Sequence, residues 1–279
     1  MAFPIGGLGA GMITLEGSGA LSHFSVSNKP DMFHEPEQFA VIHVKGLEDG
    51  TKVLEGMDQR WHPCFESARF LARFPFGMVE LSDSDFPLDV TITGWSPFIP
   101  TDPDNSGLPV GALEYHFTIT SDSAMKAIFS YHSTNFMAMG DIGKTIKSFP
   151  NGFLLHQSGT KENPHYRGGF AVFIKEGRVI SNHNWWDGLG LDARVWLWKN
   201  LEKGKNMSNP PAEDRPAISE HSVESTGASV YKAITPKPGE WQTIQLLFAG
   251  MYPTRMSVVV QVLLRKTRVM LKRKALVPL

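Results

Sequence analysis

The stretch 88–119 constrains the fold of this chain more than any other part of the sequence. Leu88, Val90 and Ile92 alternate with polar residues, and an apolar side chain at every second position is typical of a β-strand with one buried face. After a loop rich in turn-forming residues, SPFIPTDPDNSG (96–107), an apolar run over 110–119 resumes the extended pattern. Two strands joined by an ordered loop, with no helical period between them, favour antiparallel pairing.

The rest of the chain repeats this pattern of short strands and turns. DARVWLW (192–198) is the most helix-like segment, 47–68 reads as a looser connection, and 199–226 reads as a surface loop. Further strands are expected within 12–16, 21–30, 37–46, 124–134, 152–181, 228–235 and 241–251. The sequence therefore predicts an all-β protein, a large antiparallel β-sandwich with long ordered loops and little helix.

Composition and charge narrow the class of function. The chain has 279 residues, 42% of them apolar, and a net charge of -1, so it can bury a large core and has no electrostatic reason to bind nucleic acid. Because Cys64 is the only cysteine, no intramolecular disulfide and no thiolate metal cage can form. No cofactor or metal site is expected. The start, MAFPIGGLGAG, does not read as a signal peptide; the sequence assigns no compartment and slightly favours the cytoplasm.

The last segment, 256–279, differs in composition from the residues before it. It carries six Lys or Arg and no Asp or Glu, which leaves 21 basic and 28 acidic residues, a net charge of -7, in the first 255. Its apolar run, Val258 to Leu264, is too short to span a bilayer. Two readings are open: an amphipathic end that lies on a membrane surface, or sequence outside the fold. We favour the second, with the folded domain at 1–255 and the tail at 256–279.

Three local patterns resemble functional motifs without the required spacing. Four glycines within 6–11 could suggest a phosphate loop, but they do not follow G-x-G-x-x-G and precede a strand, so a close approach of backbones is expected there. His62 and Cys64 lack two further metal ligands at matching spacing. The acid pairs Asp83 with Asp85 and Asp102 with Asp104 lie in turn sequences, where Asp normally hydrogen-bonds the nearby backbone.

The aromatic segment around Trp185, Trp186 and Asp187 is the candidate carbohydrate contact. An indole ring can pack against the C–H groups on one face of a pyranose. The same tryptophans could equally belong to the core. The residues leave both readings open.

Four segments of the chain, 3–30, 72–115, 185–187 and 238–255, resemble the N-terminal domain of glycoside hydrolase family 116 in order and spacing. The family contains the non-lysosomal glucosylceramidases and bacterial β-glucosidases. The most distinctive block is ARFPFGMVELSD followed by FPLDVTITGWSPFIPTDPDNSGLPVGALEY. The resemblance implies a β-sandwich that packs on a C-terminal (α/α)6 barrel, which supplies both catalytic carboxylates of a retaining β-glycosidase.

The chain is expected to lack that barrel, so no catalytic residue is transferred to it. The first hypothesis is a non-catalytic domain, inactive by itself, whose partner is the barrel and which meets a glucoside or glucosylceramide-like substrate only through the barrel. A stand-alone carbohydrate-binding sandwich is the alternative. A structural or membrane-surface protein that uses the basic tail is a third. No membrane span is expected.

Overall fold

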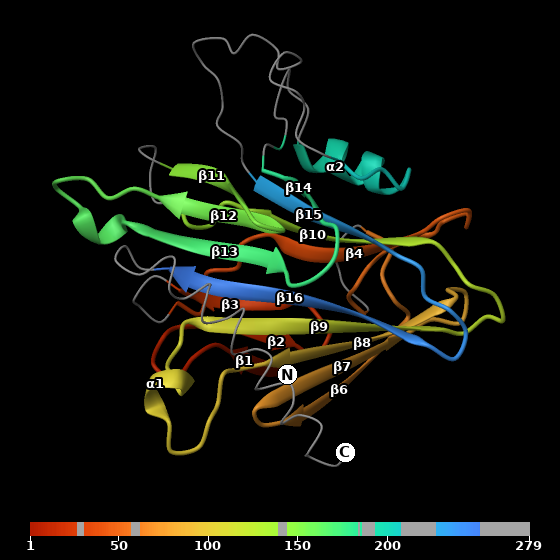
Figure 1. Ribbon diagram of the computed structural model, residues 1–279, viewed down its shortest axis with the longest axis horizontal. Coiled ribbons are helices and arrows are strands. Elements are labelled where there is room, and N and C mark those ends of the chain that lie inside the picture. The colour runs from red at the N-terminus through yellow and green to blue at the C-terminus, as the bar shows by residue number, and fades with distance from the viewer. Residues whose placement is uncertain are drawn as a thin grey trace, which may run out of the picture.

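The fold is built around an eight-stranded antiparallel sheet, with two smaller antiparallel sheets packed against it (Figure 1). The computed structural model describes residues 1–26, 31–56, 62–138, 144–183, 185, 193–207 and 227–251. In spatial order the large sheet consists of β11 (Lys144–Phe149), β12 (Gly152–Gln157), β13 (Gly168–Ile174), β16 (Trp241–Met251), β9 (Val110–Ile119), β8 (Leu88–Trp95), β7 (Phe76–Ser82) and β6 (Ser67–Arg73).

The smaller sheets have five and three strands. The five-stranded sheet has the order β14 (Ile180–Asn182), β15 (Gly227–Ile234), β10 (Ala127–Thr134), β4 (Gln38–Val44) and β5 (Thr51–Val53). The three-stranded sheet consists of β1 (Ala2–Ile5), β2 (Met12–Glu16) and β3 (Leu21–Ser25). Side chains from all three sheets meet in one large apolar cluster, which we call the main core.

Alternation of burial along the strands matches the sequence pattern. In β8 the side chains of Leu88, Val90 and Ile92 are buried in the main core, and Asp89 and Thr91 between them are half-buried. β8 pairs with β9 in antiparallel register over its whole length. The all-β prediction and the antiparallel pairing of these two strands are therefore confirmed.

Helices are short and lie outside the sheets. α1 (Pro103–Ser106) is a single turn in the loop between β8 and β9, and the 3-10 turn η1 (Pro164–Tyr166) precedes β13. α2 (Ala193–Leu201) begins within the most helix-like segment, 192–198, and extends three residues into the segment 199–226 that was expected to be a surface loop. It packs through Ala193, Leu197 and Leu201 on the outside of the five-stranded sheet (Figure 1). None of the described helices is long and apolar enough to cross a membrane.

Candidate functional site

Trp185, the described member of the expected carbohydrate contact, is a core residue. Its side chain is 3% exposed, and its Nε1 donates a hydrogen bond of 2.8 Å to Ser229 Oγ. The indole lies so close to Gly227 that a Cβ atom there would come within 2.3 Å of the ring. Trp186 and Asp187 lie outside the described residues, so a carbohydrate contact in this segment stays a prediction.

One acidic residue of each turn sequence, Asp83 and Asp102, binds the nearby backbone, as expected. Asp83 accepts hydrogen bonds from the backbone N–H groups of Asp85 and Glu66, and its carboxylate forms an ion pair with Lys52. Burial raises the pKa of Asp83, but the hydrogen bond and charge of Lys52 and the backbone donors outweigh it, and the net shift is downward. Asp102 caps α1 by accepting a 3.1 Å hydrogen bond from Asn105 N.

The His62 and Cys64 pair forms no metal site with other described residues. The imidazole of His62 stacks on the indole of Trp198 with 4.0 Å between ring centroids. Cys64 is a free cysteine, and its carbonyl oxygen accepts a hydrogen bond from Lys52 Nζ. Within the described part of the chain, no three His, Cys, Asp or Glu side chains are grouped as metal ligands would be.

The large sheet is apolar on both faces. Besides the main core, a second buried cluster uses the alternate residues of the same strands, and therefore lies on the opposite face. This outer cluster consists of Trp95, Val110, Ala112, Leu154, Ala171, Phe173, Leu247 and Ala249, each at most 5% exposed. No residue of α1 or α2 belongs to it. A sheet with two apolar faces requires a layer on each.

Strand register makes the outer cluster continuous. Ala112 lies between Trp95 on one neighbouring strand and Leu247 on the other, and Leu247 is in turn paired with Phe173. The alternation of Leu88, Val90 and Ile92 predicted a strand with one buried face, and this second buried face was not predicted. The available signal was the nearly uninterrupted apolar run in FAVFI (170–174) and LLFA (246–249), which is typical of strands buried on both faces.

The glycine stretch 6–11 approaches the backbone of another loop, as the sequence indicated. Leu8 N donates a 2.8 Å hydrogen bond to Ser106 O, and a Cβ atom on Gly7 would lie only 2.0 Å from Leu108 O. Gly6 N donates to Ser96 Oγ at 3.1 Å. These contacts fix the β8–β9 loop against the start of the chain.

A hollow of about 500 Å³ lies beside the glycine stretch. Three large apolar side chains line it while remaining in solvent: Leu8 is 59% exposed, Phe74 58% and Phe98 38%. The rings of Phe74 and Phe98 contact each other edge to face, with 4.9 Å between centroids. We call these three residues the apolar rim. Such a gathering of exposed apolar side chains is typical of a surface that another protein or domain covers.

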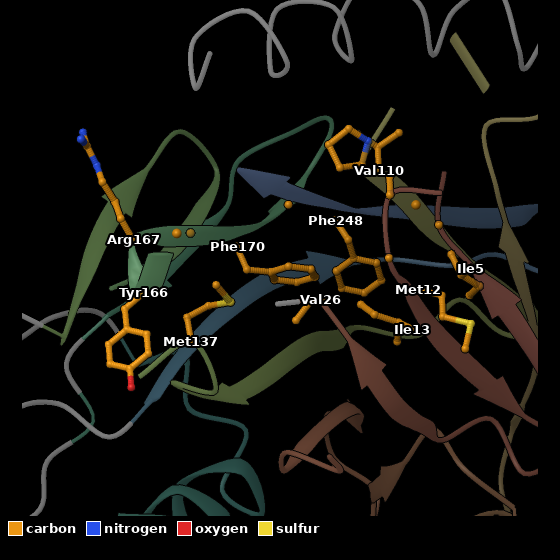
Figure 2. Close-up of a pocket in the computed structure, with 18 of the residues that line it drawn as sticks. Ile5, Met12, Ile13, Val26, Val110, Met137, Tyr166, Arg167, Phe170 and Phe248 are labelled. Carbon is orange, nitrogen blue, oxygen red and sulfur yellow. The ribbon is translucent and has the colours of Figure 1, made fainter. Parts of the chain in front are cut away.

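Figure 2 shows a second hollow, a narrow apolar crevice between the three-stranded and eight-stranded sheets. Its free volume is about 90 Å³, below the range of about 300–1,000 Å³ common for ligand pockets. Ile13, Phe170 and Phe248 line its apolar part, and the side chains of Tyr166 and Arg167 lie at one end. None of the described residues that line either hollow is Asp or Glu. These hollows can offer apolar contacts and backbone hydrogen bonds.

Comparison with known proteins identifies the family of the chain. A family model described as beta-glucosidase 2, glycosyl-hydrolase family 116 N-term, matches residues 2–262. No curated protein matches the chain. Among solved structures, a protein described as a candidate kojibiose phosphorylase from the human microbiome is similar with a TM-score of 0.38 and 8% sequence identity. The similarity covers 86% of this chain and 26% of that protein.

Proposed function

The chain belongs to the N-terminal domain family of glycoside hydrolase family 116, and from this premise we propose that it is the non-catalytic sandwich domain of a retaining β-glucosidase or glucosylceramidase-like enzyme. The domain supports a C-terminal (α/α)6 barrel, and the barrel supplies the nucleophile and the acid/base carboxylate. Those two groups must stand about 5 Å apart across the scissile bond. The chain by itself is therefore inactive, and it meets a glucoside or glucosylceramide-like substrate only through the barrel.

The family match over residues 2–262 is the observation that carries this proposal. The match ends seven residues beyond the expected domain boundary at 255, and that boundary stays a prediction. One structural feature adds support: the apolar rim of Leu8, Phe74 and Phe98 is exposed beside the glycine stretch.

We assign the apolar rim as the surface that contacts the barrel. Fully burying a side chain of this size contributes about 1.5–3 kcal/mol, so three of them can anchor an interface between domains. Replacing Phe74 by Glu would place a charge in that contact, and the loss of one central anchor typically weakens association by about 2 kcal/mol, or about 30-fold.

A test measures association between the purified chain and a separately produced barrel domain of the same family by sedimentation or calorimetry. Phe74→Glu and Phe98→Glu should weaken the complex. Val195→Glu is the matched control, because Val195 is 48% exposed on α2, on the outside of the five-stranded sheet. Equal affinity for all three variants would show that the apolar rim is not part of the interface. Failure of the unaltered chain to associate with the barrel would contradict the supporting role.

A further inference from the structure

The face of the large sheet that carries the outer cluster becomes polar toward the other end of β8, β9 and β16. Register places Asp89, Thr118 and Trp241 in one row across β8, β9 and β16. The next row holds Thr91, His116 and Thr243. We call these six residues the polar strip. All six are exposed or half-buried, whereas Thr93 and Glu114, which lead into the outer cluster, are buried.

Trp241 presents an indole to solvent within the polar strip. It is 77% exposed, more than any other tryptophan that the structure describes; Trp196 on α2 is 36% exposed, and Trp95 and Trp185 are buried. The ring of His116 stands edge-on to the indole, with 6.3 Å between centroids at 72°. His116 is itself held by Thr243 Oγ1 at 2.8 Å and lies 3.5 Å from Glu114 Oε2. The indole thus has an ordered polar neighbour and an open surface.

Asp89 lies in the same row as Trp241 and can accept hydrogen bonds from a ligand. Its side chain is half-buried, burial raises the pKa of its carboxyl, and no described residue gives it a hydrogen bond or ion pair. The oxygens of this partly desolvated carboxylate are therefore available to accept hydrogen bonds from the hydroxyls of a ligand. Neighbouring strands lie about 4.8 Å apart, so the backbones of Asp89 and Trp241, two strands apart, are separated by about 10 Å.

Pyranose sugars fit this combination of groups. One face of a pyranose carries C–H groups that pack against an indole, and the hydroxyls at its edge can donate to a carboxylate and accept from threonine O–H groups. A few placed polar groups beside an apolar platform are typical of a site that fixes the orientation of a small neutral ligand.

We propose that the polar strip is a carbohydrate-binding surface, in which Trp241 stacks on a pyranose ring and Asp89 accepts hydrogen bonds from its hydroxyls. This site lies on the opposite side of the molecule's large sheet from the main core and apart from Trp185, which packs on the five-stranded sheet. It does not depend on the barrel, because all six residues come from β8, β9 and β16 of this chain.

The experiment titrates the complete chain, without any barrel, with cellobiose, maltose and sorbitol, and follows binding by ligand-observed NMR and calorimetry. Sorbitol carries comparable hydroxyls but no ring face, so it should not bind. Trp241→Ala and Asp89→Asn should each weaken disaccharide binding about tenfold, which corresponds to about 1.4 kcal/mol. Trp241→Phe should retain part of the affinity, because a smaller aromatic face remains.

Trp196→Ala is the matched control, since it removes another exposed indole that lies on α2. Its affinity should equal that of the unaltered chain, and circular dichroism should show that every variant folds. The proposal is overturned if the unaltered chain gives no saturable binding, if sorbitol binds as well as the disaccharides, or if Trp241→Ala binds as tightly as Trp196→Ala. None of these results bears on association with the barrel, so the two proposals fail separately.

Discussion

His132 should make the stability of the sandwich depend on pH. It lies on β10 with no exposed surface, and burial lowers its pKa from 6.5 to about 3. Its Nδ1 lies 2.8 Å from Ser229 Oγ, its Nε2 lies 2.9 Å from Ser130 Oγ, and its ring centroid is 4.9 Å from that of Phe39. The neutral imidazole is therefore the form that the fold accommodates.

The sign and size of the effect follow from this pKa. The unfolded chain takes up a proton on His132 below about pH 6.5, whereas the folded chain resists protonation until about pH 3. The stabilising contribution is complete above the unfolded pKa and declines as the pH falls. The decline is about 1.4 kcal/mol per pH unit, so between pH 6.5 and 5 the free energy of unfolding should fall by about 2 kcal/mol from this residue alone.

Urea unfolding at pH 7.5, 6.5, 5.5 and 5.0 measures the effect against His132→Gln. The variant should be less stable than the unaltered chain at pH 7.5. Between pH 6.5 and 5 its free energy of unfolding should fall by about 2 kcal/mol less than that of the unaltered chain. Burial also lowers the pKa of His43 and of His156, with nearby positive charges adding to it, but both residues remain in the variant and cancel in the comparison. Parallel stability curves, or an NMR titration of His132 in the folded chain with a midpoint near 6.5, would refute the reasoning.

Three further substitutions test the packing described above by chemical denaturation. Trp185→Ala should cost about 3–5 kcal/mol, because it empties a core position and removes the indole donor to Ser229, and a loss below 1 kcal/mol would contradict its assignment to the core. Gly7→Ala should destabilise the chain more than Gly9→Ala. A Cβ atom at Gly7 would collide with Leu108 O, whereas a Cβ atom at Gly9 would meet nothing within 4 Å and would be disfavoured only by the positive φ of that residue. Equal losses of stability would show that the glycine stretch does not pack closely.

Local patterns predicted the strands that carry strong alternation and missed those that do not. β8 and β9 follow the apolar spacing seen in the sequence. β5 is three residues long, too short to stand out within the connection 47–68. β11, with the sequence KTIKSF, lies at the edge of the sheet. Its Lys, Thr and Ser residues are also common in loops, so its sequence does not stand out as a strand.

Strand order and surface exposure depend on contacts between distant segments, and the sequence could not supply them. β9 lies between β8 and β16, which is more than a hundred residues away in the chain, and that neighbour completes the row of Asp89, Thr118 and Trp241. The sequence does not show which of Trp185 and Trp241 is buried. Trp185 packs against Gly227 and Trp241 remains in solvent, a difference that the sequence pattern did not indicate.

Hydrolysis of an aryl β-glucoside tests the central proposal most directly. The purified chain is measured alone, and a family 116 barrel domain at fixed concentration is measured with increasing amounts of the chain. The proposal predicts no turnover by the chain alone and a saturable rise in the activity of the barrel as the chain is added. Turnover by the pure chain, or barrel activity that is the same with and without it, would contradict the proposal of a non-catalytic supporting domain.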